Sequence, residues 1–190
     1  MGKIIVSENV TLDGVVQDPT GDEGFPRGGW LGAGPLKDDV AKAALDDALG
    51  TEAMLLGRRS YEFLAARWPS RSGALADRLN SKPKYVVSST LSDPAWNNTT
   101  VLDGDVVSQV SKLKQQLAGD INVAASAKLV HTLMEHDLVD ELRLTVFPVV
   151  LGAGDRLFAE TSGKRPMRLI RAETIGDGLP FLTYERVRDT

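Results

Sequence analysis

The sequence predicts a three-layer α/β protein, in which helices cover both faces of a mixed, mainly parallel sheet of about eight strands. Short apolar runs alternate with stretches of helical periodicity through the first 150 residues, which is typical of parallel strands joined by helical crossovers. The C-terminal part instead holds two strand-like segments around a Gly-Asp-Gly turn, which predicts an antiparallel hairpin at the sheet edge. Because no linker interrupts the pattern, residues 1–190 are expected to form a single domain.

The predicted strands are bounded by residues that end regular structure. The first, KIIVSENV at residues 3–10, is rich in β-branched residues and stops before an Asp-Gly turn. A segment rich in glycine and proline, residues 17–35, follows it and predicts a long loop. The later strands are expected at residues 52–57, 84–90, 121–125 and 140–150, and in the hairpin segments MRLIRAETIG and LPFLTYERV.

The predicted helices carry apolar residues at three- and four-residue spacing. In the first of them, residues 38–49, one apolar face is formed and Gly50 marks the end. The remaining helices are expected at residues 58–68, 106–119 and 126–138.

Composition and charge exclude several classes of function. The chain has 190 residues, no cysteine and a net charge of -4. The absence of cysteine rules out disulfide bonds and thiolate metal sites, and the acidic balance is unfavourable for binding a nucleic-acid backbone. His131 and His136 lie five residues apart, a spacing that does not place them on one helix face, so no metal site is expected. With no apolar segment long enough for a signal peptide or a membrane span, we expect a cytoplasmic protein that binds neither nucleic acid nor membranes.

Polar residues gather where the predicted parallel strands end, which is where open α/β sheets bind ligands. LLGRRSYE (55–62) places two arginines and a serine at a helix start, where they either bind a phosphate group or simply cap the helix. VVSST (86–90) places hydroxyl groups at the next strand end, as hydrogen-bond donors or as turn residues. The fold brings these ends to one rim, so together they predict a groove for an extended phosphorylated ligand.

The third strand end, INVAASAKLV (121–130), has the strand–turn–helix arrangement that holds phosphates at a helix N-terminus, but its turn contains no glycine. A methyl group there hinders the close approach of a ligand to the backbone without excluding it. The chain also lacks a GxGxxG motif after the first strand, a phosphate-loop lysine and a GxSxG nucleophile motif. These absences argue against classical dinucleotide folds, phosphate-loop nucleotide hydrolysis and serine hydrolysis.

Taken in order, several motifs resemble the dihydrofolate-reductase-like superfamily, and within it the bacterial group related to the reductase domain of riboflavin biosynthesis. The resemblance runs from about residue 3 to residue 187. The segments that carry it are TLDG (11–14), LLGRRSYE (55–62), VVSST (86–90), VAASAKL (123–129) and LVDELRLTVFPVVLGAGDRLF (138–158).

The resemblance implies the dihydrofolate-reductase-like fold and NADPH as the cofactor. The positions that match the family's nicotinamide, pyrophosphate and 2'-phosphate contacts are Asn9, Val16, Gly57, Arg58, Arg59, Ser60, Ser88, Ser89, Ala125, Ser126, Ala127 and Lys128. Arginines and paired serines suit the dianionic 2'-phosphate, which would favour NADPH over NADH. Family members commonly carry a glycine where this chain has Ala125, so the turn is expected to be present but altered.

The reaction implied is hydride transfer to a C=N or C=O group of a small heterocyclic substrate, pterin-like or pyrimidine-like. For the proton donor, the nearest match to the family's helix carboxylate is Asp39, although such a residue also suits a plain helix start. Asp13 in the TLDG turn, with Phe25 and Trp30 in the long loop, is expected on the substrate side, while the alternative for the two aromatic residues is ordinary packing.

A second interpretation assigns the same fold to a protein that binds a ligand without catalysing a reaction. A non-catalytic nucleotide or small-molecule binding module is favoured by Ala125 and by the uncertain proton donor, and opposed by the intact arginine and serine clusters. In either case a homodimer is expected, because LRLTVFPVVL and the terminal hairpin could bury a sheet edge against a second subunit.

Overall fold

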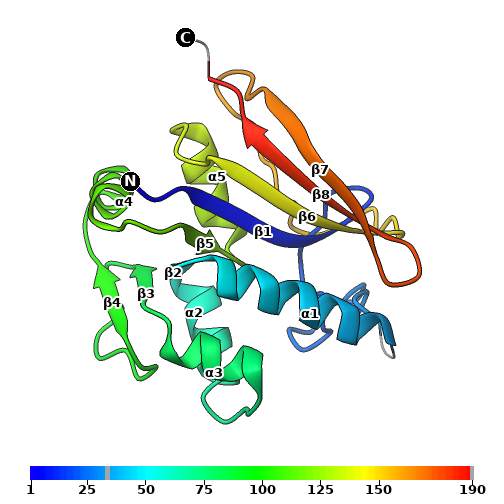
Figure 1. Ribbon diagram of the computed structural model, residues 1–190, viewed down its shortest axis with the longest axis horizontal. Helices are drawn as coiled ribbons and strands as arrows, with labels where there is room; N and C mark the ends of the chain where they lie inside the picture. Colours follow the sequence, from blue (N-terminus) through cyan, green and yellow to red (C-terminus); the bar gives the residue numbers. More distant parts are fainter. Residues whose placement is uncertain (33–34, 189–190) are drawn as a thin grey trace.

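The computed structural model describes residues 1–32 and 35–188, with residues 35–37 described by their backbone alone. Within these ranges the chain forms one eight-stranded sheet and five helices (Figure 1). The strands are β1 (Ile4–Thr11), β2 (Ala53–Gly57), β3 (Lys84–Val87), β4 (Thr99–Leu102), β5 (Ile121–Val123), β6 (Glu141–Phe147), β7 (Met167–Ile175) and β8 (Leu179–Arg186).

The order of strands across the sheet is β4-β3-β2-β5-β1-β6-β8-β7. The strands from β4 to β6 run parallel, while β8 pairs antiparallel with both β6 and β7. This confirms the predicted mixed, mainly parallel sheet with its C-terminal antiparallel hairpin. One detail of the prediction was wrong: β6 lies between β1 and β8, so the strand expected at a subunit edge is internal, and the hairpin's β7 is the edge strand.

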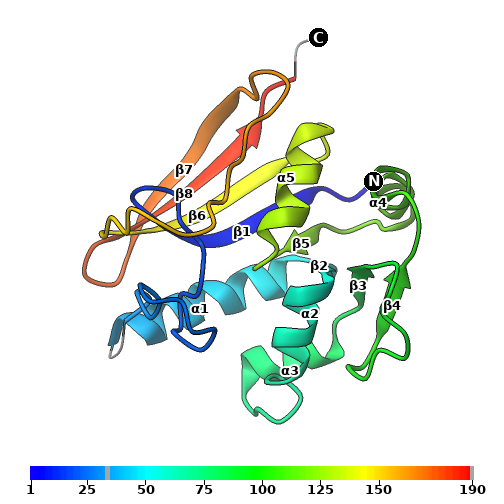
Figure 2. The same ribbon diagram turned by 180° about the vertical axis from the view of Figure 1, so that it is seen from behind.

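Helices cover both faces of the sheet, as Figures 1 and 2 show from opposite sides. One face carries α1 (Pro35–Gly50), α2 (Arg58–Ala65) and α3 (Ala74–Ser81), and the other carries α4 (Val106–Gln116) and α5 (Ala127–Glu135). Alternation along each strand sends neighbouring side chains to opposite faces. On β2, for example, Leu55 packs in the cluster under α4 and α5, whereas Met54 and Leu56 pack with Tyr61 of α2.

Two elements were not predicted from the sequence, β4 and α3. Strand β4 has four residues at the edge of the sheet, and three of them are only partly buried, so its apolar pattern is weak. Helix α3 follows Gly73, which has a φ of 107°, and has only eight residues. Short elements with so few buried apolar residues show no clear hydrophobic periodicity. The first helix also begins earlier than predicted, at a proline, which is a favoured first helical residue.

The fully buried Lys84 links β3 to the two segments beside it. Its Nζ donates to the main-chain oxygens of Lys82 at 2.7 Å, Asn97 at 3.0 Å and Asn80 at 3.1 Å, and lies 4.4 Å from the centre of the Trp96 ring. Burial lowers the pKa of Lys84 to about 8. The lysine therefore supplies a donor to three main-chain oxygens on either side of β3.

We expect Lys84→Met to destabilise the fold by about 2–4 kcal/mol, since three main-chain oxygens, one of them fully buried, lose their donor. Urea denaturation measures this loss, and Lys164→Met at an exposed position serves as the control. A Lys84→Met protein within about 0.5 kcal/mol of the unaltered one would show that these hydrogen bonds contribute no net stability.

Candidate functional site

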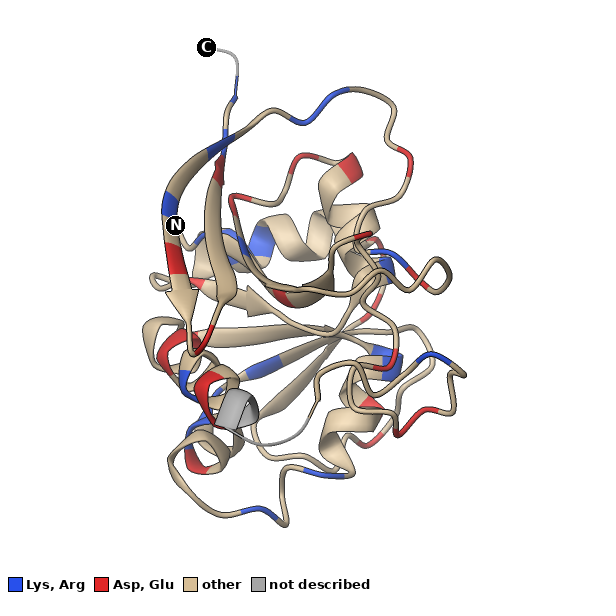
Figure 3. Ribbon diagram, turned by 90° about the vertical axis from the view of Figure 1, so that its right-hand side faces the viewer, with Lys and Arg blue, Asp and Glu red and all other residues tan. Residues whose placement is uncertain are grey.

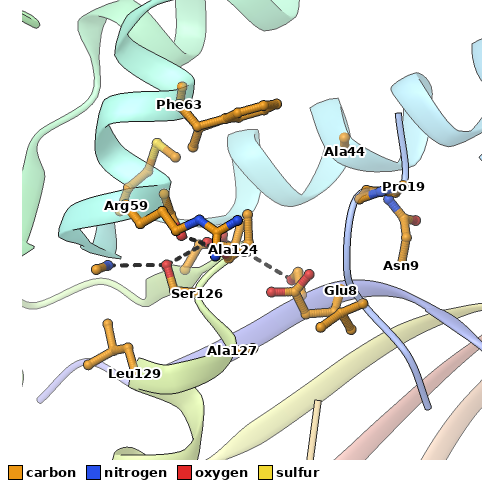
Figure 4. A pocket seen from close by; sticks show the side chains of 18 of the residues that line it. Glu8, Asn9, Pro19, Ala44, Arg59, Phe63, Ala124, Ser126, Ala127 and Leu129 are labelled. Carbon is orange, nitrogen blue, oxygen red and sulfur yellow. Dashed lines mark hydrogen bonds between the residues drawn. The ribbon is translucent and has the colours of Figure 1, made fainter. Parts of the chain in front are cut away.

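A cavity of 460 Å³ opens at the carboxyl ends of β1, β2 and β5 (Figure 4). Its walls come from α1, from the N-terminal turns of α2 and α5, and from the loop that follows β1. This is the place where parallel sheets bind ligands, and the volume lies within the usual range for small-molecule sites.

The turns after β2 and β5 are tied together by hydrogen bonds at this cavity. The Gly57 N–H donates to Ser126 Oγ at 3.1 Å, and Ser126 Oγ donates to the Ala124 oxygen at 3.0 Å (Figure 4). Ser60 Oγ, from the first turn of α2, donates to the main-chain oxygen of Ala125. As a result the first turns of α2 and α5 face one space, and their free N–H groups and dipoles favour an anion there.

Ala125 has a φ of 55°, so this alanine adopts the left-handed conformation that glycine adopts most easily. The cost for an alanine is about 1 kcal/mol. The turn has therefore kept a glycine-like backbone shape although it contains no glycine. The sequence left open whether the turn after β5 keeps its shape without a glycine. The backbone does keep this shape, and the side chain of Ala125 adds one methyl group to it.

Four basic side chains line the cavity, and three of them already have partners. Arg58 Nε lies 2.8 Å from Glu62 and Arg58 also donates to the Thr90 hydroxyl, whereas Arg59 forms a 3.0 Å ion pair with Glu23 across the mouth of the cavity. Lys82 Nζ donates to Thr51 Oγ1 at 2.6 Å, and Lys128, in the first turn of α5, is the fourth. On the side of the molecule drawn in Figure 3, basic and acidic residues are interspersed.

Most of the predicted cofactor residues lie at this cavity. Those that line it are Asn9, Val16, Gly57, Arg58, Arg59, Ser60, Ala125, Ser126, Ala127 and Lys128. Ser88 and Ser89 do not line it. Ser88 Oγ accepts the N–H groups of Thr90 at 3.2 Å and Leu91 at 3.0 Å, so this hydroxyl stabilises the turn after β3, next to Arg58.

Asp13 also lies outside the cavity. It accepts hydrogen bonds from the Thr11 hydroxyl at 2.7 Å and from the N–H groups of Gly152 at 2.8 Å and Leu151 at 3.1 Å. These bonds, led by the one from Thr11, lower the pKa of Asp13 to about 2. Asp13 thus joins the turn after β1 to the loop after β6.

The aromatic residues of the long loop pack elsewhere. The ring of Trp30 meets the ring of Phe147 edge to face at 5.3 Å, and its Nε1 donates to the Gln17 oxygen at 2.9 Å. Phe25 lies close to Gly154, in the loop after β6. Neither lines the cavity. The loop folds on Asp18, whose carboxylate accepts main-chain N–H groups from later in the same loop.

Asp39 is placed away from the cavity, in a second hollow between α1 and the β7–β8 hairpin. Its carboxylate lies next to Gly176, in the hairpin turn. Asp39 lies five residues before Ala44, which does line the cavity, and at 3.6 residues per turn the two side chains leave α1 on different sides. The structure therefore does not bring Asp39 together with the other predicted site residues.

Sequence reasoning missed the polar residues on the strands themselves. Asn122 of β5 donates through Nδ2 to Ser7 Oγ of β1 at 2.9 Å on the floor of the cavity. Glu8 of β1 also lines it, and its Oε1 is buried without a hydrogen-bond partner. Burial raises the pKa of Glu8 to about 8, although the nearby main-chain amides of Ala125 and Ser126 act in the opposite direction. The available signal was a polar residue near the carboxyl end of an apolar strand.

Neither a metal-binding cluster nor a membrane-spanning helix is found among the residues that the structure describes. No group of three or more His, Cys, Asp or Glu side chains there could hold a metal ion. No helix among them has the length and apolar character needed to cross a membrane.

The sheet order, the terminal hairpin and the cavity at the ends of β1, β2 and β5 define a dihydrofolate-reductase-like α/β protein. Residues 2–181 match the RibD C-terminal domain family, and the chain belongs to this family. The family and the fold are those of reductases.

Individual relatives and solved structures agree with this family and this fold. The uncharacterized protein YyaP of Bacillus subtilis is 27% identical over 187 residues, which cover 96% of this chain and 94% of YyaP. A crystal structure from Shewanella sp. PV-4, named for riboflavin biosynthesis, has a TM-score of 0.77 at 24% identity, with 98% and 99% of the two chains covered. Dihydrofolate reductase from Enterococcus faecalis complexed with NADP(H) has a TM-score of 0.63 at 15% identity and coverage of 97% and 96%. At these identities the two structures establish the fold.

Proposed function

We propose that this protein is an NADPH-dependent reductase that transfers a hydride to a C=N or C=O carbon of a small heterocyclic compound, pterin-like or pyrimidine-like. The observation that carries the proposal is the junction of the first turns of α2 and α5, with Arg58, Arg59 and Lys128 beside it, at one cavity. A polyanionic nucleotide is the ligand whose charge fits this junction.

The residues at the cavity fit a nicotinamide dinucleotide phosphate. Ala125 keeps the left-handed turn that lets a phosphate approach the main-chain N–H groups. Arg58 donates to the Thr90 hydroxyl in the turn after β3, where the 2'-phosphate would be held, and Asn9 and Val16 would lie at the nicotinamide end. When bound, the reduced nicotinamide supplies the hydride. The chain positions the two reactants and excludes water.

The cavity walls further support a flat substrate with polar edges. Phe63, Leu64 and Trp68 provide apolar surface, while the Asn122–Ser7 pair on the floor provides hydrogen-bonding groups. Such a combination suits the ring of a pterin or a pyrimidine, whose edges carry alternating donors and acceptors.

Calorimetric titration with NADPH and with NADH tests the proposal. We expect NADPH to bind about 10- to 100-fold more tightly, since charge-assisted hydrogen bonds to the 2'-phosphate contribute about 1.5–3 kcal/mol. Arg58→Ala should remove most of this preference while leaving NADH binding nearly unchanged. Arg171→Ala, on the exposed strand β7, is the matched control. Equal binding of both cofactors by the unaltered protein would contradict the 2'-phosphate pocket.

The placement of Asp39 outside the cavity favours a second candidate, a non-catalytic nucleotide-binding module on the same fold. The two functions differ in one result. A reductase oxidises NADPH when a pterin or pyrimidine acceptor is added, whereas a binding module binds the nucleotide and leaves it reduced with every acceptor.

A further inference from the structure

Glu8 lies in the wall of the cavity, next to the turn that joins β5 to α5. Figure 4 shows its side chain directed from β1 toward the segment that carries Ala124 and Ser126. Its Oε1 is the one buried side-chain oxygen or nitrogen without a hydrogen-bond partner in residues 1–32 and 38–188. A buried polar atom without a partner costs free energy, and such groups are retained mainly where they have a function.

The other acidic side chains at the cavity are satisfied or exposed. Asp47 is paired with Arg143 at 2.6 Å, Glu23 is paired with Arg59, and Asp155 is exposed. Asp18 accepts main-chain N–H groups. Among the acids that line the cavity, Glu8 alone has a buried side-chain oxygen without a hydrogen-bond partner.

Burial keeps Glu8 protonated at neutral pH, because its pKa of about 8 lies above the pH of the solution. The charged side chains that line the cavity come from α1, the loop after β1, α2, the segment after α3, α5 and the loop after β6. They are Asp47, Asp18, Glu23, Arg58, Arg59, Lys82, Lys128 and Asp155. None of them is a cause of the shift, which reflects desolvation opposed by two main-chain amides.

We propose that Glu8 is the proton donor of this site, a neutral carboxylic acid that protonates the heteroatom of the acceptor as the adjoining carbon receives the hydride. This inference rests on the proposed reductase function. In the reduction, the π bond of C=N or C=O breaks, a C–H bond forms with the hydride of the reduced nicotinamide, and an N–H or O–H bond forms with the Glu8 proton. Glu8 is left as a carboxylate and regains a proton from water, and the nicotinamide is left oxidised.

A group that must give up a proton near neutral pH works best when its pKa lies near that pH. Glu8 meets this requirement from a fixed position in the sheet, since it pairs with Leu144 of β6. It also explains how the site operates without Asp39. Bound phosphate groups at the adjoining turn add negative charge, which favours the neutral acid further.

The first test observes Glu8 directly, with no substrate. Carbon-13 NMR of protein labelled at the glutamate side-chain carboxyl groups gives one titration curve per residue, and the Glu8 signal is assigned by its loss in Glu8→Gln. We expect a midpoint near pH 8 in the free protein and a higher midpoint with NADPH bound. A midpoint among those of the exposed glutamates, or one that NADPH leaves unchanged, would overturn the proposal.

The second test separates this proposal from the reductase proposal. Glu8→Gln should bind NADPH with unchanged affinity at pH 7, oxidise it at least 100-fold more slowly with a pterin or pyrimidine acceptor, and lose the decline in rate above pH 8. Glu173→Gln, at an exposed position of β7, is the control. Undiminished turnover by Glu8→Gln removes the role of Glu8 and leaves the reductase. Failure of the unaltered protein to bind NADPH, or to oxidise it with any acceptor, removes both.

Discussion

Ala125→Val is expected to raise the dissociation constant for NADPH about 100-fold and to lower the free energy of unfolding by about 1–3 kcal/mol. Residue 125 has a φ of 55°, a conformation that a β-branched side chain tolerates poorly. The main chain must therefore move, and the Ser60 hydroxyl then loses its acceptor at the Ala125 oxygen. With it the turn loses the alignment of its N–H groups toward a phosphate, a loss of two charge-assisted hydrogen bonds.

Ala125→Gly provides the opposite change at the same position. We expect it to retain or tighten NADPH binding and to be as stable as the unaltered protein or up to about 1 kcal/mol more stable, because glycine adopts this conformation without steric cost. Calorimetry gives the affinities, urea denaturation gives the stabilities, and Ala159→Val at an exposed loop position is the control. If valine bound NADPH as well as glycine did, the turn would not be the phosphate site.

Between pH 5 and pH 8, Glu8 is expected to lower the free energy of unfolding of the unaltered protein by about 2–4 kcal/mol. Glu8→Gln should not show this loss. Burial raises the pKa of Glu8 from 4.5 to about 8, so the folded state holds a proton that the unfolded state releases in this range. The stability contributed by Glu8 is therefore complete below pH 4.5 and is lost as the pH rises to 8. Glutamine carries no ionisable group, and the variant should lack this decline.

Urea denaturation of both proteins at pH 5, 6.5 and 8 measures the difference. Lys82 and Lys84, whose pKa values burial lowers from 10.5 to about 8, act in a separate window. They add stability as the pH rises from 8 to 10.5, and they are present in both proteins, so they cancel in the comparison. Parallel stability curves for the two proteins between pH 5 and pH 8 would mean that Glu8 ionises in the folded state as it does in water.

The sequence was sufficient to predict a mixed, mainly parallel sheet with a C-terminal hairpin, because alternating apolar runs and helical patterns decide between parallel and antiparallel strands. It was sufficient for much of the cavity as well, since the ends of adjacent parallel strands must meet at one rim. The sequence pattern did not predict the two short elements. Strand β4 and helix α3 are held by packing against neighbours, as with Trp96, which is buried between them and donates to Asn80 at 2.7 Å.

The sequence also did not predict the roles of side chains that depend on residues distant in the chain. The sequence gives no sign that Glu8 is dehydrated, because that depends on the β5–α5 turn more than a hundred residues later. Likewise, the aromatic residues of the long loop were expected at the substrate, but the loop folds on Asp18 and turns Trp30 toward Phe147. A loop has no hydrophobic periodicity, so its sequence does not show which way its side chains point.

The central position of β1 has a consequence for the order in which the protein is made. Ile4 pairs with Ile121, and Ile5 pairs with both Asn122 and Glu141, so β1 has no partner until at least 117 further residues have been synthesised. At translation rates of about 5–20 residues per second, this takes roughly 6 to 23 s. During that time β2 and β3 can already pair, while the apolar segment Ile4–Val6 stays open to chaperones and to other nascent chains. The strand that carries Glu8 therefore joins the sheet late, and the cavity is completed only after most of the chain has been synthesised.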